Sequence, residues 1–185
     1  MLTKIFYYTI ILIFFSFYGN ATNLKFTKIV NLYDPWSLTF INHNELLISE
    51  KNGKIKLINL TTKKIKEIEH NLNYSSYGQG GLLDIIYKDN TIWIAYSEER
   101  GYSKTSTSIA KAIYNTTKMN FKNIFQAYPP INSGYHFGSR LAIKDNYLYA
   151  SVGERGKGMI AQDGSKHPGS IIRIHIDGSI PKDNP

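Results

Sequence analysis

A strand–turn–strand unit repeats three times along this sequence, and the repeat constrains the fold more than any other feature. In each copy, a short apolar run reaches a polar turn and continues into a second apolar run that ends in glutamate. Equivalent positions in successive copies lie roughly 50 residues apart, a period typical of repeat architectures. The three copies are Leu38–Glu50, Ile85–Glu98 and Leu141–Glu154.

Further strand-like segments follow each unit, and no segment shows a sustained helical period. Turns of the Asn-Gly and Asp-Asn kind separate the runs, as expected between antiparallel strands. Four strands in about 40–50 residues form one blade of a β-propeller. The sequence therefore predicts an all-β fold with about three propeller blades. Hairpin turns are expected at 51–53, 88–90 and 144–146, and further strands at 54–60, 63–68, 107–114, 121–127 and 170–176.

Three blades cannot form a closed ring, because propellers close with about four to eight blades. An open ring leaves long sheet edges exposed, which folded proteins avoid. We therefore expect this chain to form part of a larger propeller and to be inactive alone.

The first 21 residues have the layout of a secretory signal peptide. Lys4 supplies the positive start, Ile5–Tyr18 is a nearly unbroken apolar run, and Gly19-Asn20-Ala21 offers small residues for cleavage. A membrane anchor is the alternative, but the run is shorter than the roughly 20 residues that a spanning helix needs. The chain has no cysteine, so disulfides cannot stabilise it after export. We predict residues 1–21 as a signal peptide and a periplasmic or secreted location.

The formal net charge of +8 raises the possibility of a nucleic-acid partner. However, the lysines are scattered over turns and short strands, as in Lys54-Ile55-Lys56 and Lys63-Lys64-Ile65-Lys66. Alternating lysines on strands are explained by solvated faces that discourage edge-to-edge aggregation. No nucleic-acid partner is therefore predicted.

Polar residues stand at the start of the first strand and the end of the second in each unit. In an antiparallel hairpin these two points are neighbours, and the innermost strands of a propeller converge on its central channel. We expect these groups to gather at one mouth of the channel, with Glu50 and Glu98 as solvated strand ends. We call the start of the first strand the entrance of a unit and the end of its second strand the exit. The entrances are Asp34-Pro35-Trp36, Gly78-Gln79-Gly80-Gly81 and Tyr135-His136-Phe137-Gly138; the exits are Glu50, Glu98-Glu99 and Glu154-Arg155.

Only the third unit pairs a histidine with a carboxylate at this mouth. His136 and Glu154 can come within hydrogen-bond reach, and such a carboxylate suits an imidazole to act as a general base. A structural role for a single loop histidine is the alternative. The sequence contains no histidine spacing typical of zinc, no P-loop, no G-x-S-x-G and no EF-hand loop.

Several segments, in order along the chain, resemble the soluble aldose sugar dehydrogenases that use pyrroloquinoline quinone (PQQ), the glucose/sorbosone dehydrogenase family. Gly78–Leu83 resembles a GQGGLLG-type segment, and His136–Leu141 with Val152–Arg155 resembles an H-F-G-x-R-L…x-G-E/D block. The three last segments resemble an A-Q-D…G-K-x-x-R-x…D-G-x-I-P-x-D-N-P block, and the opening Pro35–Leu38 also fits. The matching segments are Pro35–Leu38, Gly78–Leu83, His136–Leu141, Val152–Arg155, Ala161–Asp163, Gly169–Ile174 and Asp177–Pro185.

This resemblance implies a six-bladed propeller, of which residues 22–185 would form the N-terminal half. It implies oxidation of the anomeric carbon of aldoses to lactones, with hydride transfer to PQQ beside a bound calcium. His136 would be the base, Glu154 would orient it, and Gln79 would line the sugar site. Arg140 would instead link two blades. The chain departs from the family pattern at Tyr135, where Asp or Asn is usual, and at Ser170, where Lys is usual.

The remaining expectations also follow from the resemblance. The PQQ-binding and calcium-binding residues would lie mostly in the second half, so none is assigned to this chain. An external electron acceptor is implied, and the complete protein could form a homodimer. The alternative is a six-bladed propeller with another role, either a calcium-dependent lactonase or a sugar-binding module, which would not need a base paired to Glu154.

Export can be tested directly. Cleavage after Ala21 makes Thr22 the first residue of the mature protein. N-terminal sequencing of the protein recovered from the periplasm should therefore begin at Thr22. Recovery of the protein in a membrane fraction with Met1 retained would contradict this prediction.

Overall fold

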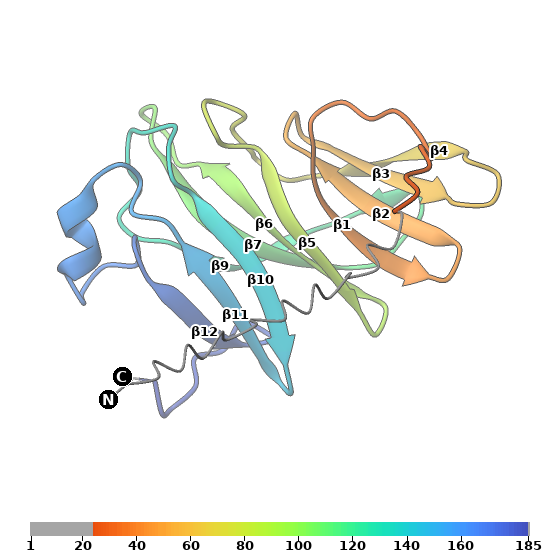
Figure 1. Cartoon of the computed structure of the whole chain (residues 1–185). Helices are drawn as coiled ribbons and strands as arrows, with labels where there is room; N and C mark the ends of the chain where they lie inside the picture. The colour runs from red at the N-terminus through yellow and green to blue at the C-terminus, as the bar shows by residue number, and fades with distance from the viewer. Residues whose placement is uncertain (1–23, 185) are drawn as a thin grey trace, which may run out of the picture.

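The computed structural model describes residues 24–184, which form three sheets placed one after another in chain order (Figure 1). The predicted signal peptide lies outside the described residues. The first sheet holds β1 (Pro35–Asn42), β2 (Glu45–Glu50), β3 (Lys54–Asn59) and β4 (Ile65–His70), with β8 (Lys118–Met119) added to β4. The second holds β5 (Leu82–Lys88), β6 (Thr91–Glu99), β7 (Thr105–Ile113) and β9 (Lys122–Gln126). The third holds β10 (Gly138–Lys144), β11 (Tyr147–Val152) and β12 (Ile171–His175), with a short 3₁₀ helix, Gly158–Gln162, before β12.

The strands of each sheet follow one another as an antiparallel meander, apart from β8, which pairs with β4 in parallel. The first strand of each sheet lies at one edge, and β5 packs against both β1 and β10. This arrangement of blades confirms the predicted propeller fold. The three predicted hairpins are present, because their turn residues accept positive φ: +89° at Gly53, +58° at Asn90 and +54° at Asp145. The other predicted strands match to within a few residues at each end.

Two apolar clusters hold the sheets together. The first lies between the first and second sheets, where Leu47 and Ile55 meet residues of β5 and β6. The second lies between the second and third sheets, where Leu141 and Leu148 meet residues of β6 and β7. Strand β6 contributes to both, because alternate side chains of a strand point to opposite faces. Its apolar run Ile92–Tyr96 is consequently buried on both sides.

A buried carboxylate joins the first strands of all three sheets. Asp84, on β5, is only 4% exposed. It accepts hydrogen bonds from the Ser37 hydroxyl on β1 (2.5 Å) and from the Leu141 amide on β10 (2.7 Å). Arg140 completes the group with an ion pair of 3.0 Å to Asp84. The expected blade-to-blade role of Arg140 is therefore confirmed.

The prediction that Glu50 and Glu98 are solvated strand ends is wrong. Glu50 is 2% exposed and accepts a hydrogen bond of 3.0 Å from the backbone N–H of Tyr33. Glu98 is 8% exposed. In both cases, segments that are distant in sequence cover the end of the strand and supply the donors.

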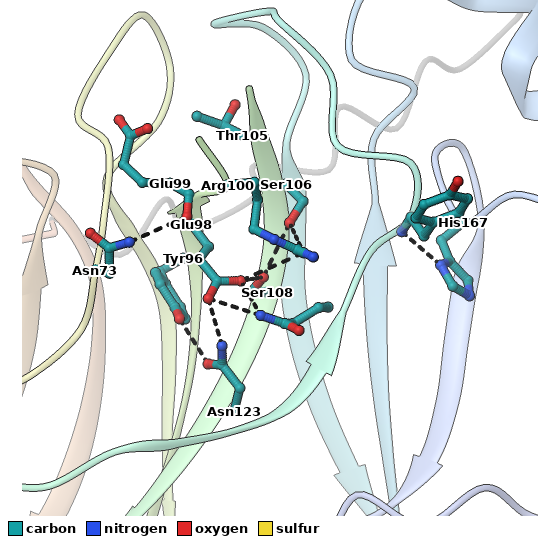
Figure 2. A network of polar contacts seen from close by, with 12 residues as sticks. Asn73, Tyr96, Glu98, Glu99, Arg100, Thr105, Ser106, Ser108, Asn123 and His167 are labelled. Carbon is teal, nitrogen blue, oxygen red and sulfur yellow. Dashed lines mark hydrogen bonds and ion pairs between the residues drawn. The ribbon is translucent and has the colours of Figure 1, made fainter. Parts of the chain in front are cut away.

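Figure 2 shows the polar network that surrounds Glu98. Its carboxylate accepts hydrogen bonds from Ser108 (2.6 Å), Asn123 (2.7 Å) and Gln126 (2.7 Å), which lie on β7 and β9. Tyr96, on the same face of β6, donates to the Asn123 side chain at 2.7 Å. Burial, followed by the Glu98 charge, raises the pKa of Tyr96. Because each polar group is satisfied, this network can lie beside the apolar interface.

Between residues 24 and 184, no helix is long and apolar enough to cross a membrane.

The hydrogen bonds that Asp84 accepts from two neighbouring sheets predict a loss of stability when the carboxylate is removed. Asp84→Ala removes the acceptor of the Leu141 amide and of Ser37, so the free energy of unfolding should fall by about 2 kcal/mol in urea denaturation. Glu69→Ala serves as the control, because Glu69 is an exposed carboxylate on β4 and its loss should cost less than about 0.5 kcal/mol. Equal losses in the two variants would contradict the role of Asp84.

Candidate functional site

The strand entrances and exits meet at one end of the sheets, as the hairpin geometry requires. The start of β1 pairs with the end of β2, and the start of β10 pairs with the end of β11. The loop before β5 contacts both neighbouring sheets. The Lys51 side chain donates to the Ser76 carbonyl at 3.0 Å, and the backbone N–H of Gln79 donates to the Gly134 carbonyl at 2.7 Å. The candidate site is built on this junction.

His136 lies in a crowded turn that only a glycine partner permits. Its φ is +49°, in the left-handed region. The backbone N–H of Arg155 donates to the His136 carbonyl at 3.3 Å. A Cβ on Gly153 would stand 2.0 Å from the same carbonyl, so a larger residue at Gly153 would displace the histidine. This turn fixes where the imidazole leaves the backbone.

The predicted pairing of His136 with Glu154 is present. His136 Nδ1 is hydrogen-bonded to Glu154 Oε1, and the Gly156 amide donates to the same oxygen at 3.1 Å. Because a carboxylate accepts this bond, the proton resides on Nδ1. Nε2 is then the proton acceptor, on an imidazole side chain that is 53% exposed. The hydrogen bond from His136 also lowers the pKa of Glu154.

Gln79 lies beside His136, although the two are far apart in sequence. Its side-chain carbonyl accepts the His136 backbone N–H at 2.8 Å. The side-chain oxygen of Gln79 is therefore occupied by this hydrogen bond, and the side-chain NH₂ group can donate to a ligand. Buried Ser97 holds this loop in place by accepting the Gly81 amide at 2.7 Å. The structure therefore brings together all three predicted site residues, His136, Glu154 and Gln79.

The sequence places Arg155 at the same mouth but does not indicate that its side chain is buried. It is only 2% exposed, and its guanidinium carbon lies 3.7 Å from the centre of the Phe137 ring. Burial lowers the pKa of Arg155 to about 10, while the Glu154 charge acts in the opposite direction. From sequence alone, an arginine next to a strand-end glutamate suggests an ion pair exposed to solvent. Only the acceptors around it, which lie elsewhere in the chain, reveal its burial.

The described residues show no cluster of side chains that could hold a metal ion. From residue 24 to residue 184, no group of three or more His, Cys, Asp and Glu side chains is arranged to hold a metal ion. The buried Arg155 donates to backbone and hydroxyl oxygens of the chain itself. We therefore assign no PQQ or calcium ligand to this part of the chain.

The sequence matches the family described as Glucose / Sorbosone dehydrogenase over residues 32–185. The chain belongs to this family. It is 30% identical over 161 residues to aldose sugar dehydrogenase YliI of Escherichia coli strain K12, a match that covers 82% of this chain and 43% of the relative. The chain spans a little under half the length of the curated relatives it matches.

Solved structures agree with this assignment. The apo-form crystal structure of the soluble aldose sugar dehydrogenase from Escherichia coli superimposes with a TM-score of 0.79 at 30% identity, covering 83% of this chain and 47% of that one. The PQQ-bound form of an aldose sugar dehydrogenase from Streptomyces coelicolor gives a TM-score of 0.73 at 25% identity, covering 84% and 48%. The three sheets are thus similar to part of these dehydrogenases.

The His136–Glu154 pair predicts the titration of the carboxyl group. Because its pKa is lowered in the folded state, the pairing stabilises the fold above the unfolded-state pKa of glutamate. That contribution is lost as the pH falls through the folded-state value. His136→Ala should shift the pKa of Glu154 upward in a ¹³C NMR titration of the glutamate carboxyls.

Glu67 is the internal control for this titration. Its pKa is lowered by Lys56 and Lys54 on the first sheet, so it should not move in His136→Ala. An unchanged Glu154 titration in the variant would show that the pair does not form in solution.

Proposed function

We propose that the protein oxidises the anomeric carbon of aldose sugars to lactones, with hydride transfer to PQQ. Membership of the glucose/sorbosone dehydrogenase family and likeness to a PQQ-bound relative support this proposal. The observation that carries it is the His136–Glu154 pair, because it leaves His136 Nε2 as a proton acceptor on a half-exposed imidazole. A sugar-binding module has no need of such a base.

The side chains of the site have distinct roles in this reaction. His136 Nε2 removes the proton of the anomeric hydroxyl, while the hydrogen on the same carbon leaves as hydride and the C–O bond becomes a carbonyl. Glu154 holds the imidazole and stabilises the imidazolium that results. Gln79 donates from its NH₂ group to a sugar oxygen. PQQ, when bound, supplies the hydride acceptor.

Other parts of the proposal concern the whole protein. In it, calcium accompanies PQQ, an external acceptor reoxidises the reduced cofactor, and the protein acts in the periplasm or outside the cell. A homodimer is part of the same proposal. The resemblance of the sequence to the family motivates the cofactor, the acceptor and the homodimer, and the signal-peptide pattern of residues 1–21 motivates the location. In this proposal, most of the groups that bind PQQ and calcium lie in the second half of the propeller.

The catalytic assignment predicts unequal losses in three variants. In a protein that also carries the second half of the propeller, His136→Ala should reduce the turnover of aldoses by about 10²–10⁴-fold and leave PQQ binding largely intact, because the histidine acts on the proton of the substrate. Glu154→Gln should cause a smaller loss. The double variant should lose little more than His136→Ala, since the two residues act as one unit.

Turnover would be measured with an artificial electron acceptor in the presence of PQQ and calcium. His43→Ala is the matched control, because His43 is an exposed turn histidine distant from the pair. Near-normal turnover in His136→Ala would refute the catalytic role. The lactonase or sugar-binding alternative would then be preferred.

A further inference from the structure

Arg155 binds the chain on both sides of His136. Its Nε donates to the Tyr135 carbonyl at 2.9 Å, directly before the histidine. Its guanidinium carbon lies 3.7 Å from the centre of the Phe137 ring, directly after it. A second donor, Nη2, reaches the carbonyl of Ser133 in the same loop. One buried cation therefore holds three residues of the histidine loop.

The same guanidinium fixes this loop to the neighbouring sheet. Nη1 donates to the Thr105 carbonyl at 3.0 Å, and Nη2 donates to the Thr105 hydroxyl at 2.8 Å. Thr105 begins β7, a strand of the second sheet. The backbone N–H of Thr105 also donates to the Ile131 carbonyl at the start of the loop. Arg155 thus joins the loop to a strand that is buried at this point.

The arrangement leaves Glu154 for the imidazole. The hydrogen bonds of the Arg155 side chain go to Tyr135, Thr105 and Ser133, and Glu154 Oε1 receives His136 and the Gly156 amide. Neighbouring residues therefore divide two tasks. Arg155 holds the backbone of the loop, and Glu154 holds the ring.

The loop needs such a clamp because its backbone is strained. His136 and Arg155 both have positive φ, +49° and +60°, which costs non-glycine residues of order 1 kcal/mol each. Without the guanidinium, the Tyr135 carbonyl would lose its donor from Arg155, and the carbonyls of Ser133 and Thr105 would each keep only a neutral donor, the Thr105 hydroxyl and the Ile131 N–H. Hydrogen bonds from charged donors are stronger than those from neutral ones, so the loop would be held less tightly. The loop would relax, and the imidazole would leave Glu154.

We propose that Arg155 is a positioning residue that holds the His136 imidazole on Glu154 with its Nδ1 proton directed at the carboxylate. Its effect on turnover rests on the proposed dehydrogenase function, but its effect on the imidazole does not. A planar fork of donors makes these contacts, so a lysine, which is a point charge, can replace the charge but not the geometry.

The test compares Arg155→Met, Arg155→Lys and Arg173→Met in the purified protein. Long-range ¹H–¹⁵N spectra report which imidazole nitrogen of His136 carries the proton. Arg173 is the matched control, because it also lies over an aromatic ring, Tyr147 at 5.2 Å, and binds Asn184 at 2.7 Å in the third sheet. Thermal denaturation of each variant measures general loss of stability.

The wild type and Arg173→Met should both show His136 protonated at Nδ1. Arg155→Met should lose this signal and give a mixture of tautomers, and Arg155→Lys should restore only part of it. Where turnover is measurable, kcat should fall by about 10-fold or more in Arg155→Met while KM changes little. Should Arg155→Met not fold, the folded Arg155→Lys carries the comparison.

An unchanged His136 signal in Arg155→Met, or in Arg155→Lys when only that variant folds, would overturn the proposal. The same loss of signal in Arg173→Met would also overturn it, because the effect would then be general loosening. If the wild type showed the Nδ1 signal but the complete propeller, supplied with PQQ and calcium, oxidised no sugar, the dehydrogenase proposal would be refuted and the role of Arg155 would stand.

Discussion

Each sheet begins with a strand that has a neighbour on one side only, and the unpaired edge of β5 lies between those of β1 and β10. Their amides need acceptors, which the side chains of the adjacent sheet supply. Asp84 accepts the Leu141 amide at 2.7 Å, and the Thr39 hydroxyl accepts the Tyr87 amide at 3.2 Å. Because buried N–H groups are rarely left unsatisfied, these few polar side chains set how the sheets stand next to one another.

The candidate site depends on that arrangement. Strand β10 carries the histidine turn at its start, and the Asp84 contacts with Arg140 and Leu141 hold this strand against β5. The loop that precedes β5 is thereby brought to the histidine, where Gln79 accepts its backbone N–H. A contact between residues 57 positions apart thus follows from the register of two blades. A small change at Asp84 would move two groups of the site relative to each other.

The sequence allowed the blades and the central pair to be predicted, because both follow from local rules. The period of the repeat indicates blades, and hairpin geometry places His136 opposite Glu154. The burial of Glu98 and Arg155 was not predictable in the same way. Their acceptors and donors, such as Asn123 on β9 and Thr105 on β7, belong to other segments, and no pattern near either residue indicates them. Charged residues at strand ends look alike in sequence whether they are solvated or enclosed.

Strand β6 is packed on both faces, and this has a consequence for motion. Amides in such a strand exchange with solvent only when one of two apolar interfaces opens, so β6 should belong to the slowest-exchanging part of the molecule. Ser97, on β6, holds the loop of Gln79, and Thr105, on the adjacent β7, receives Arg155. Both loops of the candidate site are therefore anchored to the same rigid sheet, which keeps their mutual geometry constant while the outer strands fluctuate.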